Sequence, residues 1–220
     1  MKQTVFYFFG GKMNIYLQML IAAIPAYLFG AIPCGLLIGF AKGIDIRKVG
    51  SGNIGATNVT RSVSPLAGKI CFFCDFLKGA LPAIAVQFII AHPLAAIICG
   101  LASVLGHMFP VYLKFKGGKG ISTAAGVAVA LAPLPLLTAL VIWVAAFYAS
   151  RYVSLASIIA AVMLPVSAFV FRLLNIGSVV ARSNQTLVFF IVIAVLAVVR
   201  HKSNIQRLIA GTENRFEKKK

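Results

Sequence analysis

Acidic residues are scarce in this chain. Its 220 residues include 4 Asp and Glu against 21 Lys and Arg, and the formal net charge is +17. Because carboxylates are the usual protein ligands of catalytic divalent cations, a metal-dependent phosphotransferase is poorly supported. The zinc-site pattern His-Glu-x-x-His is also absent. Any chemistry must therefore rely on cations, hydroxyls, amides and backbone N–H groups, which bind phosphate and stabilise developing negative charge.

Other familiar motifs are missing as well. A P-loop requires G-x4-G-K-[ST], but Lys119 is followed by Gly120, and position 113 is Leu. None of the 3 histidines has an Asp five positions later, which excludes the His-x4-Asp arrangement of the common membrane acyltransferases. The Cys-x-x-Cys pair at 71 and 74 has no second pair beside it. It is interpreted as a buried helix face, with a metal or redox role as the alternative.

Apolar residues dominate what is present. Hydrophobic residues make up 60% of the chain, charged residues 11%, and the mean hydropathy is +0.97, which predicts an integral membrane protein. The first apolar run continues past Ala31 without a small-residue cleavage pattern, so no cleavable signal peptide is expected. The cations gather in loops between apolar runs rather than in a basic stripe with aromatics, which disfavours nucleic-acid binding.

The apolar runs predict an all-α fold with about seven transmembrane helices, some of them short or tilted. Pro25 and Pro33 are expected to bend the first, and the prolines at 133 and 135 divide a tight hairpin. Polar loops should then lie at 42–64, 114–123 and 150–154. The predicted spans are 14–40, 69–91, 94–111, 121–132, 136–149, 155–171 and 186–199.

The distribution of cations orients these spans. Seven crossings place the three polar loops and the tail on one side, which holds sixteen Lys or Arg when Lys69 at the start of its span is included, against four on the other side. The positive-inside bias makes the first side cytoplasmic. Polar motifs far apart in the sequence can therefore converge at one membrane surface.

The first motif runs from Ser51 to Arg61 and reads SGNIGATNVTR. Gly52 and Gly55 allow positive φ and close approach to a ligand, the small polar residues offer donors, and the planar fork of Arg61 suits phosphate. These features favour an oxyanion site. The alternative is a flexible membrane loop that caps the next helix.

A second run of the same character, KFKGGKGIST, covers 114–123. Because two such runs occur, the interpretation of the first as a mere flexible loop is weakened. Together they suit acylation of a phosphorylated alcohol, which needs a phosphate clamp, an anion hole for the leaving group and an apolar channel for the acyl chain. A transporter for phosphate or a phosphorylated metabolite is the main rival, and it would place its cations near the membrane midplane. The clamp would draw on Arg61, Lys119, His201, Asn204 and Ser154, and the anion hole on Gly52, Asn53, Gly117, Gly118 and Gly120.

Asp75 and Lys78 lie three positions apart inside a predicted span, hence on one helix face. Ionisable groups at that depth are costly unless they are paired or turned inward. A structural ion pair that holds the adjacent loop and a catalytic role both remain open.

Three stretches carry a resemblance to a known family: SGNIGATN at 51–58, Gly106-His107 followed by FKGGKG at 115–120, and RHKSNIQRL at 200–208. In order and spacing the chain resembles the PlsY family of bacterial membrane glycerol-3-phosphate acyltransferases, which use acyl phosphate as donor. The resemblance implies transfer of an acyl chain to the 1-position of sn-glycerol 3-phosphate, giving lysophosphatidic acid and inorganic phosphate. This is the first step of phospholipid biosynthesis. It also implies no cofactor and no metal.

The resemblance divides the chain into an N-terminal extension (1–13), a polytopic membrane acyltransferase domain (14–199) and a cytoplasmic tail with the third motif (200–220). It places the protein in the bacterial inner membrane, multi-pass, with its active site facing the cytoplasm. The expected partners are acyl phosphate, sn-glycerol 3-phosphate and the lipid bilayer, with a functional link to the soluble enzyme that makes acyl phosphate.

The family pattern also assigns residue roles. Ser154 is one helical turn from Ser157, and spacing leaves open which of them faces the site. Glu213 is expected to order the site through a cation or a backbone N–H. Ser51 either relays a proton or leaves it to the donor phosphate. The predicted catalytic residues are Ser51, Lys119, His201 and Asn204, and the predicted substrate-binding residues are Gly52, Asn53, Thr57, Arg61, Gly117, Gly118, Gly120, Ser154 and Glu213.

Overall fold

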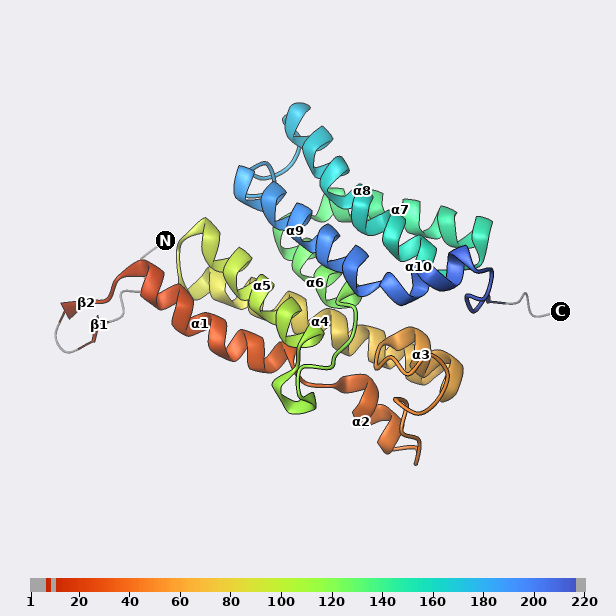
Figure 1. Cartoon of the computed structure of the whole chain (residues 1–220). Coiled ribbons are helices and arrows are strands. Elements are labelled where there is room, and N and C mark those ends of the chain that lie inside the picture. Colours follow the sequence, from red (N-terminus) through yellow and green to blue (C-terminus); the bar gives the residue numbers. More distant parts are fainter. Residues whose placement is uncertain (1–6, 9–10, 217–220) are drawn as a thin grey trace. The chain divides into compact units, whose positions relative to one another are not determined.

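The computed structural model describes residues 7–8 and 11–216 (Figure 1). Residues 1–6, 9–10 and 217–220, which include Lys2 and the terminal lysines of the charge count, lie outside the described residues. The chain divides into two compact parts, Met1–Ala130 and Leu131–Lys220. Each part is built from helices that pack along their length.

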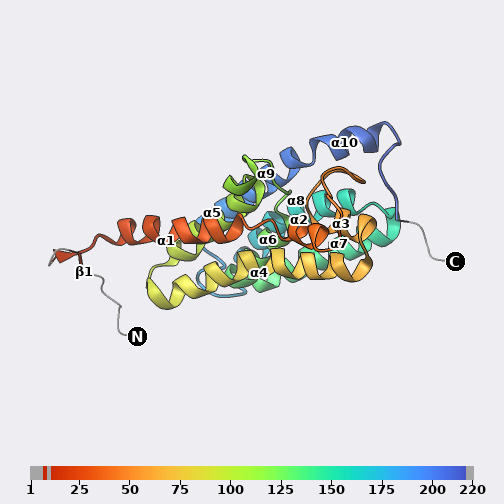
Figure 2. The ribbon, with the colours of Figure 1, turned by 90° about the horizontal axis from the view of Figure 1, so that it is seen from below.

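In the N-terminal part, α1, α4 and α5 lie side by side, and α3 packs against α4 (Figures 1 and 2). A short antiparallel pair precedes them, with Tyr7 opposite Lys12. The elements are β1 (Tyr7–Phe8), β2 (Gly11–Lys12), α1 (Ile15–Gly30), α2 (Cys34–Phe40), α3 (Ala56–Ser62), α4 (Pro65–Ile89), α5 (Pro93–Met108) and the 3-10 helix η1 (Val111–Leu113).

Close packing of α1 on α5 depends on two glycines. A Cβ atom at Gly30 would collide with the Ser103 carbonyl oxygen, and one at Gly106 would collide with the Tyr27 carbonyl oxygen. Small residues at such contacts let helix backbones approach closely, which is a common basis of helix association in membranes.

In the C-terminal part, α7 packs on α8 and α8 on α9, while α10 contacts both α8 and α9. The helix α6 (Ile121–Leu131) ends where this part begins, and Ala132 separates it from α7. The remaining elements are α7 (Pro133–Ser150), α8 (Val153–Leu173), α9 (Asn184–Arg200) and α10 (Lys202–Ile209).

The prediction of an all-helical membrane fold is confirmed. Among the described residues, five helical segments are long and apolar enough to cross a membrane, or six if α9 and α10, bent by 56°, form one span. The shorter apolar helix α6 adds the seventh predicted segment. Each of the seven predicted apolar runs is therefore helical, and about seven is an approximate count of crossings.

Several boundaries differ from the sequence prediction. The first span is interrupted at 31–33, where Pro33 precedes α2, whereas Pro25 stays inside α1. α4 begins at Pro65, four residues before the predicted start, because the Ser64 hydroxyl accepts a hydrogen bond from the Ala67 N–H (3.1 Å) and caps the helix. The second half of the first motif forms the short helix α3 rather than a loop.

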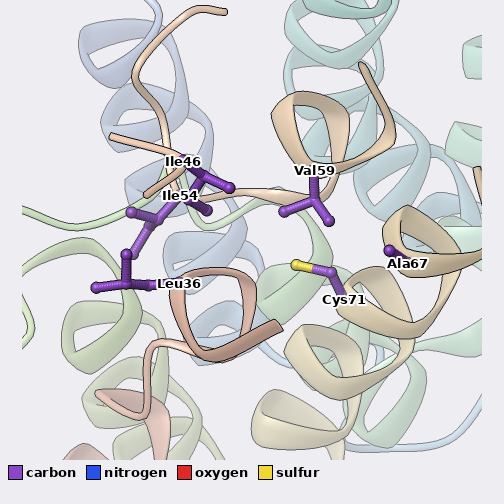
Figure 3. Packing of buried hydrophobic residues seen from close by; sticks show 6 residues of the cluster. All are labelled: Leu36, Ile46, Ile54, Val59, Ala67 and Cys71. Carbon is purple, nitrogen blue, oxygen red and sulfur yellow. The ribbon is translucent and has the colours of Figure 1, made fainter. Parts of the chain in front are cut away.

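A cluster of buried apolar side chains forms the base of the first motif (Figure 3). Its members come from α2, the following loop, α3 and α4, so it ties together three helices and the 41–55 connection. We call this group the motif-base cluster; it consists of Leu36, Ile46, Ile54, Val59, Ala67 and Cys71.

Candidate functional site

Asn58 organises the loop that carries the first motif. Its side chain is 2% exposed, and its Nδ2 donates to the carbonyl oxygens of Ile46 (2.8 Å) and Val49 (3.1 Å). Its Oδ1 accepts from the Ser51 backbone N–H (3.0 Å) and the Ser62 hydroxyl (3.3 Å). The sequence suggested Asn58 only as one of several small donors. The structure shows that the hydrogen bonds of its buried side chain hold the loop together.

Some of the other polar side chains of the first motif bond to the backbone, whereas others are exposed. Thr60 donates to the Ala56 carbonyl oxygen of its own helix (2.9 Å), and Asn53 Oδ1 accepts from the Gly55 N–H (2.8 Å). Ser51, Gly52 and Arg61 are exposed, and Gly52 has a φ of +68°. Thr57 is half-buried and lies one turn before Arg61, on the same face of α3.

Replacing Asn58 by alanine is expected to destabilise the N-terminal part. The change leaves the buried Ile46 carbonyl without its partner, a loss that costs about 1–3 kcal/mol, and it also removes the part-buried bonds to the Val49 carbonyl and the Ser51 N–H. Thermal unfolding of the purified protein should therefore begin at a clearly lower temperature. Ser62→Ala removes only the 3.3 Å bond to the same side chain and should have a small effect. Equal effects of the two changes would contradict the role of Asn58 in holding the loop.

The second motif packs its glycines against the end of α5. The Gly118 N–H donates to the His107 carbonyl oxygen (3.1 Å), and a Cβ atom at Gly118 would collide with Nε2 of His107. A Cβ atom at Gly117 would meet the same carbonyl, and Gly120 has a φ of +80°. Lys119 is half-buried between these glycines. The backbone around Lys119 is therefore closely packed, and a side chain at Gly117, Gly118 or Gly120 would force it or its neighbours to shift.

The two motifs of the N-terminal part share one apolar base. Leu113, directly before the second motif, packs against the motif-base cluster, which contains Ile54 and Val59 of the first motif. The sequence predicted that these loops would converge, and the shared packing brings their supporting residues together.

In the C-terminal part, Glu213 accepts hydrogen bonds from three side chains. Its Oε1 accepts from the Ser154 hydroxyl (2.8 Å) and from Asn204 Nδ2 (2.7 Å), while its Oε2 lies 2.7 Å from Nε of Arg207. Desolvation favours the neutral carboxyl, but the hydrogen bonds from Asn204, Ser154 and Arg207 outweigh it and hold the pKa of Glu213 below its ordinary value. We call these four residues the Glu213 cluster.

The structure separates the two candidate serines. Ser157 Oγ accepts a hydrogen bond from Nε1 of Trp143 (3.1 Å), whereas Ser154 joins the Glu213 cluster. His201 is buried between α9 and α10, and its Nδ1 lies 2.7 Å from the Ala197 carbonyl oxygen. A carbonyl can only accept, so the neutral ring carries its proton on Nδ1. Ser154 is thus the serine placed beside Asn204.

The predicted site residues therefore form two groups, one in each part of the chain. Two residues with clear structural roles, Asn58 and Arg207, were not singled out as such from the sequence. The position of Arg207, one turn after Asn204 in an amphipathic helix, was the signal available for it. Within the described ranges, no set of three or more His, Cys, Asp or Glu side chains is placed to hold a metal ion.

Comparison with known proteins gives consistent matches. The family described as "Glycerol-3-phosphate acyltransferase" matches residues 20–211. A glycerol-3-phosphate acyltransferase of Aquifex aeolicus (strain VF5) is 46% identical over 201 residues, covering 91% of this chain and 100% of that protein. One of Trichlorobacter lovleyi is 47% identical over 193 residues, covering 87% of this chain and 94% of that protein.

Solved structures of PlsY (YgiH), described as an integral membrane glycerol 3-phosphate acyltransferase, also match. The glycerol 3-phosphate form has a TM-score of 0.83 and 45% sequence identity, covering 91% of this chain and 96% of that one. The lysophosphatidic acid form has a TM-score of 0.80 and 44% identity with the same coverage. The similarity therefore extends through sequence and fold across nearly the whole length.

Proposed function

This chain belongs to the glycerol-3-phosphate acyltransferase family, and from that premise we propose that it transfers an acyl chain from acyl phosphate to the 1-position of sn-glycerol 3-phosphate. The products are lysophosphatidic acid and inorganic phosphate. The observation that carries the proposal is the shared base of the two glycine motifs, where Leu113 packs against the cluster that contains Ile54 and Val59. That base gives one membrane protein two adjacent loops of cations, hydroxyls and backbone donors.

The reaction needs charge stabilisation more than a strong protein nucleophile. The substrate hydroxyl attacks the acyl carbonyl carbon, a new ester C–O bond forms, and the bond from the carbonyl carbon to the phosphate oxygen breaks. The departing phosphate takes the hydroxyl proton, directly or through Ser51. Donor activation is already built into acyl phosphate, so orientation of the two substrates can supply much of the rate, with effective molarities on the order of 10⁵–10⁸ M in favourable cases.

Each group of residues has a proposed role. Arg61 and Lys119 clamp the phosphate of glycerol 3-phosphate, with Thr57 on the same helix face as Arg61. In the C-terminal part, Ser154, His201 and Asn204 are the proposed substrate-binding side chains, and Glu213 orders Ser154 and Asn204. The anion hole for the leaving phosphate draws on the loops at Gly52, Asn53, Gly117, Gly118 and Gly120. The N–H groups of Gly52, Asn53 and Gly118 already donate within the protein, to the Val49 carbonyl, the Ser51 hydroxyl and the His107 carbonyl. We propose Gly117 and Gly120 as the backbone donors of the anion hole.

The hydrogen bonds of Glu213 support a positioning role for this residue. As a carboxylate it repels a phosphate, but its oxygens are engaged by Ser154, Asn204 and Arg207. Its negative charge is thereby offset, and the hydroxyl and amide are held in fixed orientations. We therefore propose that Glu213 acts on the substrates through these donors rather than by direct contact.

The setting follows from charge and composition. The protein is an integral membrane protein with several helical spans. We propose the bacterial inner membrane with the site facing the cytoplasm, because sixteen Lys or Arg lie on the side of the motifs and four on the other. A soluble enzyme that makes acyl phosphate must then supply the donor. The division into 1–13, 14–199 and 200–220 stays a prediction.

The donor is the part of this proposal to test first. Purified protein in lipid or detergent, supplied with acyl phosphate and sn-glycerol 3-phosphate in the presence of a chelator, should form lysophosphatidic acid and phosphate in equal amounts. Acyl-coenzyme A in place of acyl phosphate should give no product. Turnover with acyl-coenzyme A alone would overturn the donor assignment, and loss of turnover in chelator would overturn the metal-free account.

A further inference from the structure

Three ionisable side chains that have no assigned role toward the substrates form a buried network inside the N-terminal part. Lys78 Nζ lies 2.7 Å from Oδ1 of Asp75 and 3.3 Å from Nδ1 of His107. It also donates to the Ile32 carbonyl oxygen (2.7 Å), at the break between α1 and α2. All three side chains are at most 6% exposed. The ion pair expected from the spacing of Asp75 and Lys78 is therefore present, with a third member from α5.

This network supports the second motif. His107 accepts from the Gly118 N–H through its carbonyl oxygen, and its ring lies against Gly118 so closely that a Cβ atom would collide with Nε2. The residue after Lys78 is Gly79, where a Cβ atom would collide with the Thr123 carbonyl oxygen in the first turn of α6. One short stretch of α4 thus contacts the chain on both sides of Lys119, at the end of α5 and in the first turn of α6.

The same stretch supports the first motif. The Cys71 thiol donates to Oδ2 of Asp75 (3.6 Å), and Cys71 belongs to the motif-base cluster together with Ile54 and Val59. Gly35, just after the α1–α2 break, is so close to the Ile54 carbonyl oxygen that a Cβ atom would collide with it. The ionic network is therefore continuous with the packing beneath both motifs.

We infer that Asp75, Lys78 and His107 are positioning residues, which hold the two glycine motifs at the spacing needed to bind glycerol 3-phosphate. This inference rests on the proposed function. Its physical basis is that a buried ion pair adds little stability compared with apolar side chains of similar size, whereas removal of one partner is strongly destabilising. Because this network contacts the residues beneath both motifs, we assign it the role of fixing their geometry rather than of raising stability.

The test separates stability from positioning. In the full-length purified protein, Asp75→Asn and Lys78→Met each leave a buried group without its partner and should lower the unfolding temperature. The double variant Asp75→Leu/Lys78→Met removes both charges and should recover most of that temperature. Its kcat/KM for glycerol 3-phosphate should nevertheless stay reduced by about 100-fold, the scale of a 1 Å misplacement, mainly through KM. Affinity for glycerol 3-phosphate, measured by calorimetry without a donor, should fall in parallel.

A matched control is the exposed ion pair of Asp45 and Arg47, whose carboxylate and guanidinium are 2.8 Å apart in the loop before the first motif. Asp45→Asn/Arg47→Ala should leave KM and affinity near those of the unmodified protein. The inference would be overturned if the double variant of Asp75 and Lys78 unfolds at nearly the temperature of the unmodified protein and keeps its KM and its affinity for glycerol 3-phosphate. Absence of acyl transfer by the unmodified protein would instead count against the proposed function, while the affinities still test the positioning.

A second experiment covers the case in which the double variant does not fold. His107→Ala and Gly118→Ala both disturb the same contact between the imidazole and the loop. The combined variant should therefore lose no more affinity for glycerol 3-phosphate than the worse single variant, within about a factor of 2, because effects on a shared contact are not additive. Losses that multiply would show that His107 does not act through Gly118 and would contradict the inference.

Discussion

Replacing Lys119 by alanine is expected to lower kcat/KM for acyl transfer by about 10²–10³-fold, the usual effect of removing one donor that stabilises developing negative charge. Lys119 is half-buried in a loop whose backbone is fixed by Gly118 and Gly120. A cation held there interacts with phosphate more strongly than one in open water, since the surrounding dielectric is lower. The measurement is the initial rate as a function of glycerol 3-phosphate concentration.

The matched control is Lys116→Ala, in the same loop. Lys116 is exposed and carries the same charge, so its removal changes the local net charge equally. It should alter the rate only slightly, because the attraction of an exposed charge is weakened by water and salt. Similar losses in the two variants would mean that the loop acts through its total charge and that Lys119 has no specific role.

Replacing Glu213 by alanine is expected to reduce kcat/KM by about 100-fold without removing any group that contacts the substrates. The change leaves the Ser154 hydroxyl, the Asn204 amide and the Arg207 guanidinium without their common acceptor. The first two then lose their fixed orientation. Steady-state kinetics of Glu213→Ala and Ser154→Ala should show losses of the same order. Ser157→Ala is the control, since Ser157 bonds Trp143 instead and should keep nearly full activity.

The pH dependence of stability gives an independent check on Glu213. Its pKa in the folded protein lies below the ordinary value of 4.5, so the carboxylate stabilises the fold above that pH. This stabilisation is lost as the pH falls below about 4.5 and through the lowered pKa. The unfolding temperature of the unmodified protein should therefore decline more steeply in this range than that of Glu213→Gln. Equally steep declines of the unfolding temperature in the two proteins would contradict the lowered pKa of Glu213.

Much of the fold could be predicted because the bilayer imposes simple rules. Apolar runs of sufficient length predicted the seven apolar helical segments but not the short helices α3 and α10. Pro133 correctly marked the division between α6 and α7, whereas Pro135 lies inside the first turn of α7. The polar motifs stood out because two runs of glycine, hydroxyl and cation interrupt an otherwise apolar chain. Family resemblance supplied the activity, which composition alone does not indicate.

The remaining features depend on contacts between distant residues. α8 is apolar nearly all round, since both its lipid-facing and its packed sides favour such residues, so periodicity gave no means of choosing between Ser154 and Ser157. The choice depends on Glu213, 59 positions after Ser154, which returns to α8 beyond α10. Likewise, Asn58 reads as one more small donor until the carbonyls of Ile46 and Val49 are seen to converge on it.

The central claim is that the two glycine motifs of the N-terminal part bind one substrate phosphate together. Its most direct test is an experimentally determined structure of this protein with glycerol 3-phosphate bound. We expect the phosphate to lie within hydrogen-bonding distance of Arg61 from the first motif and of Lys119 from the second. A bound phosphate that contacts only one of these motifs, with the other side chain directed elsewhere, would contradict the account.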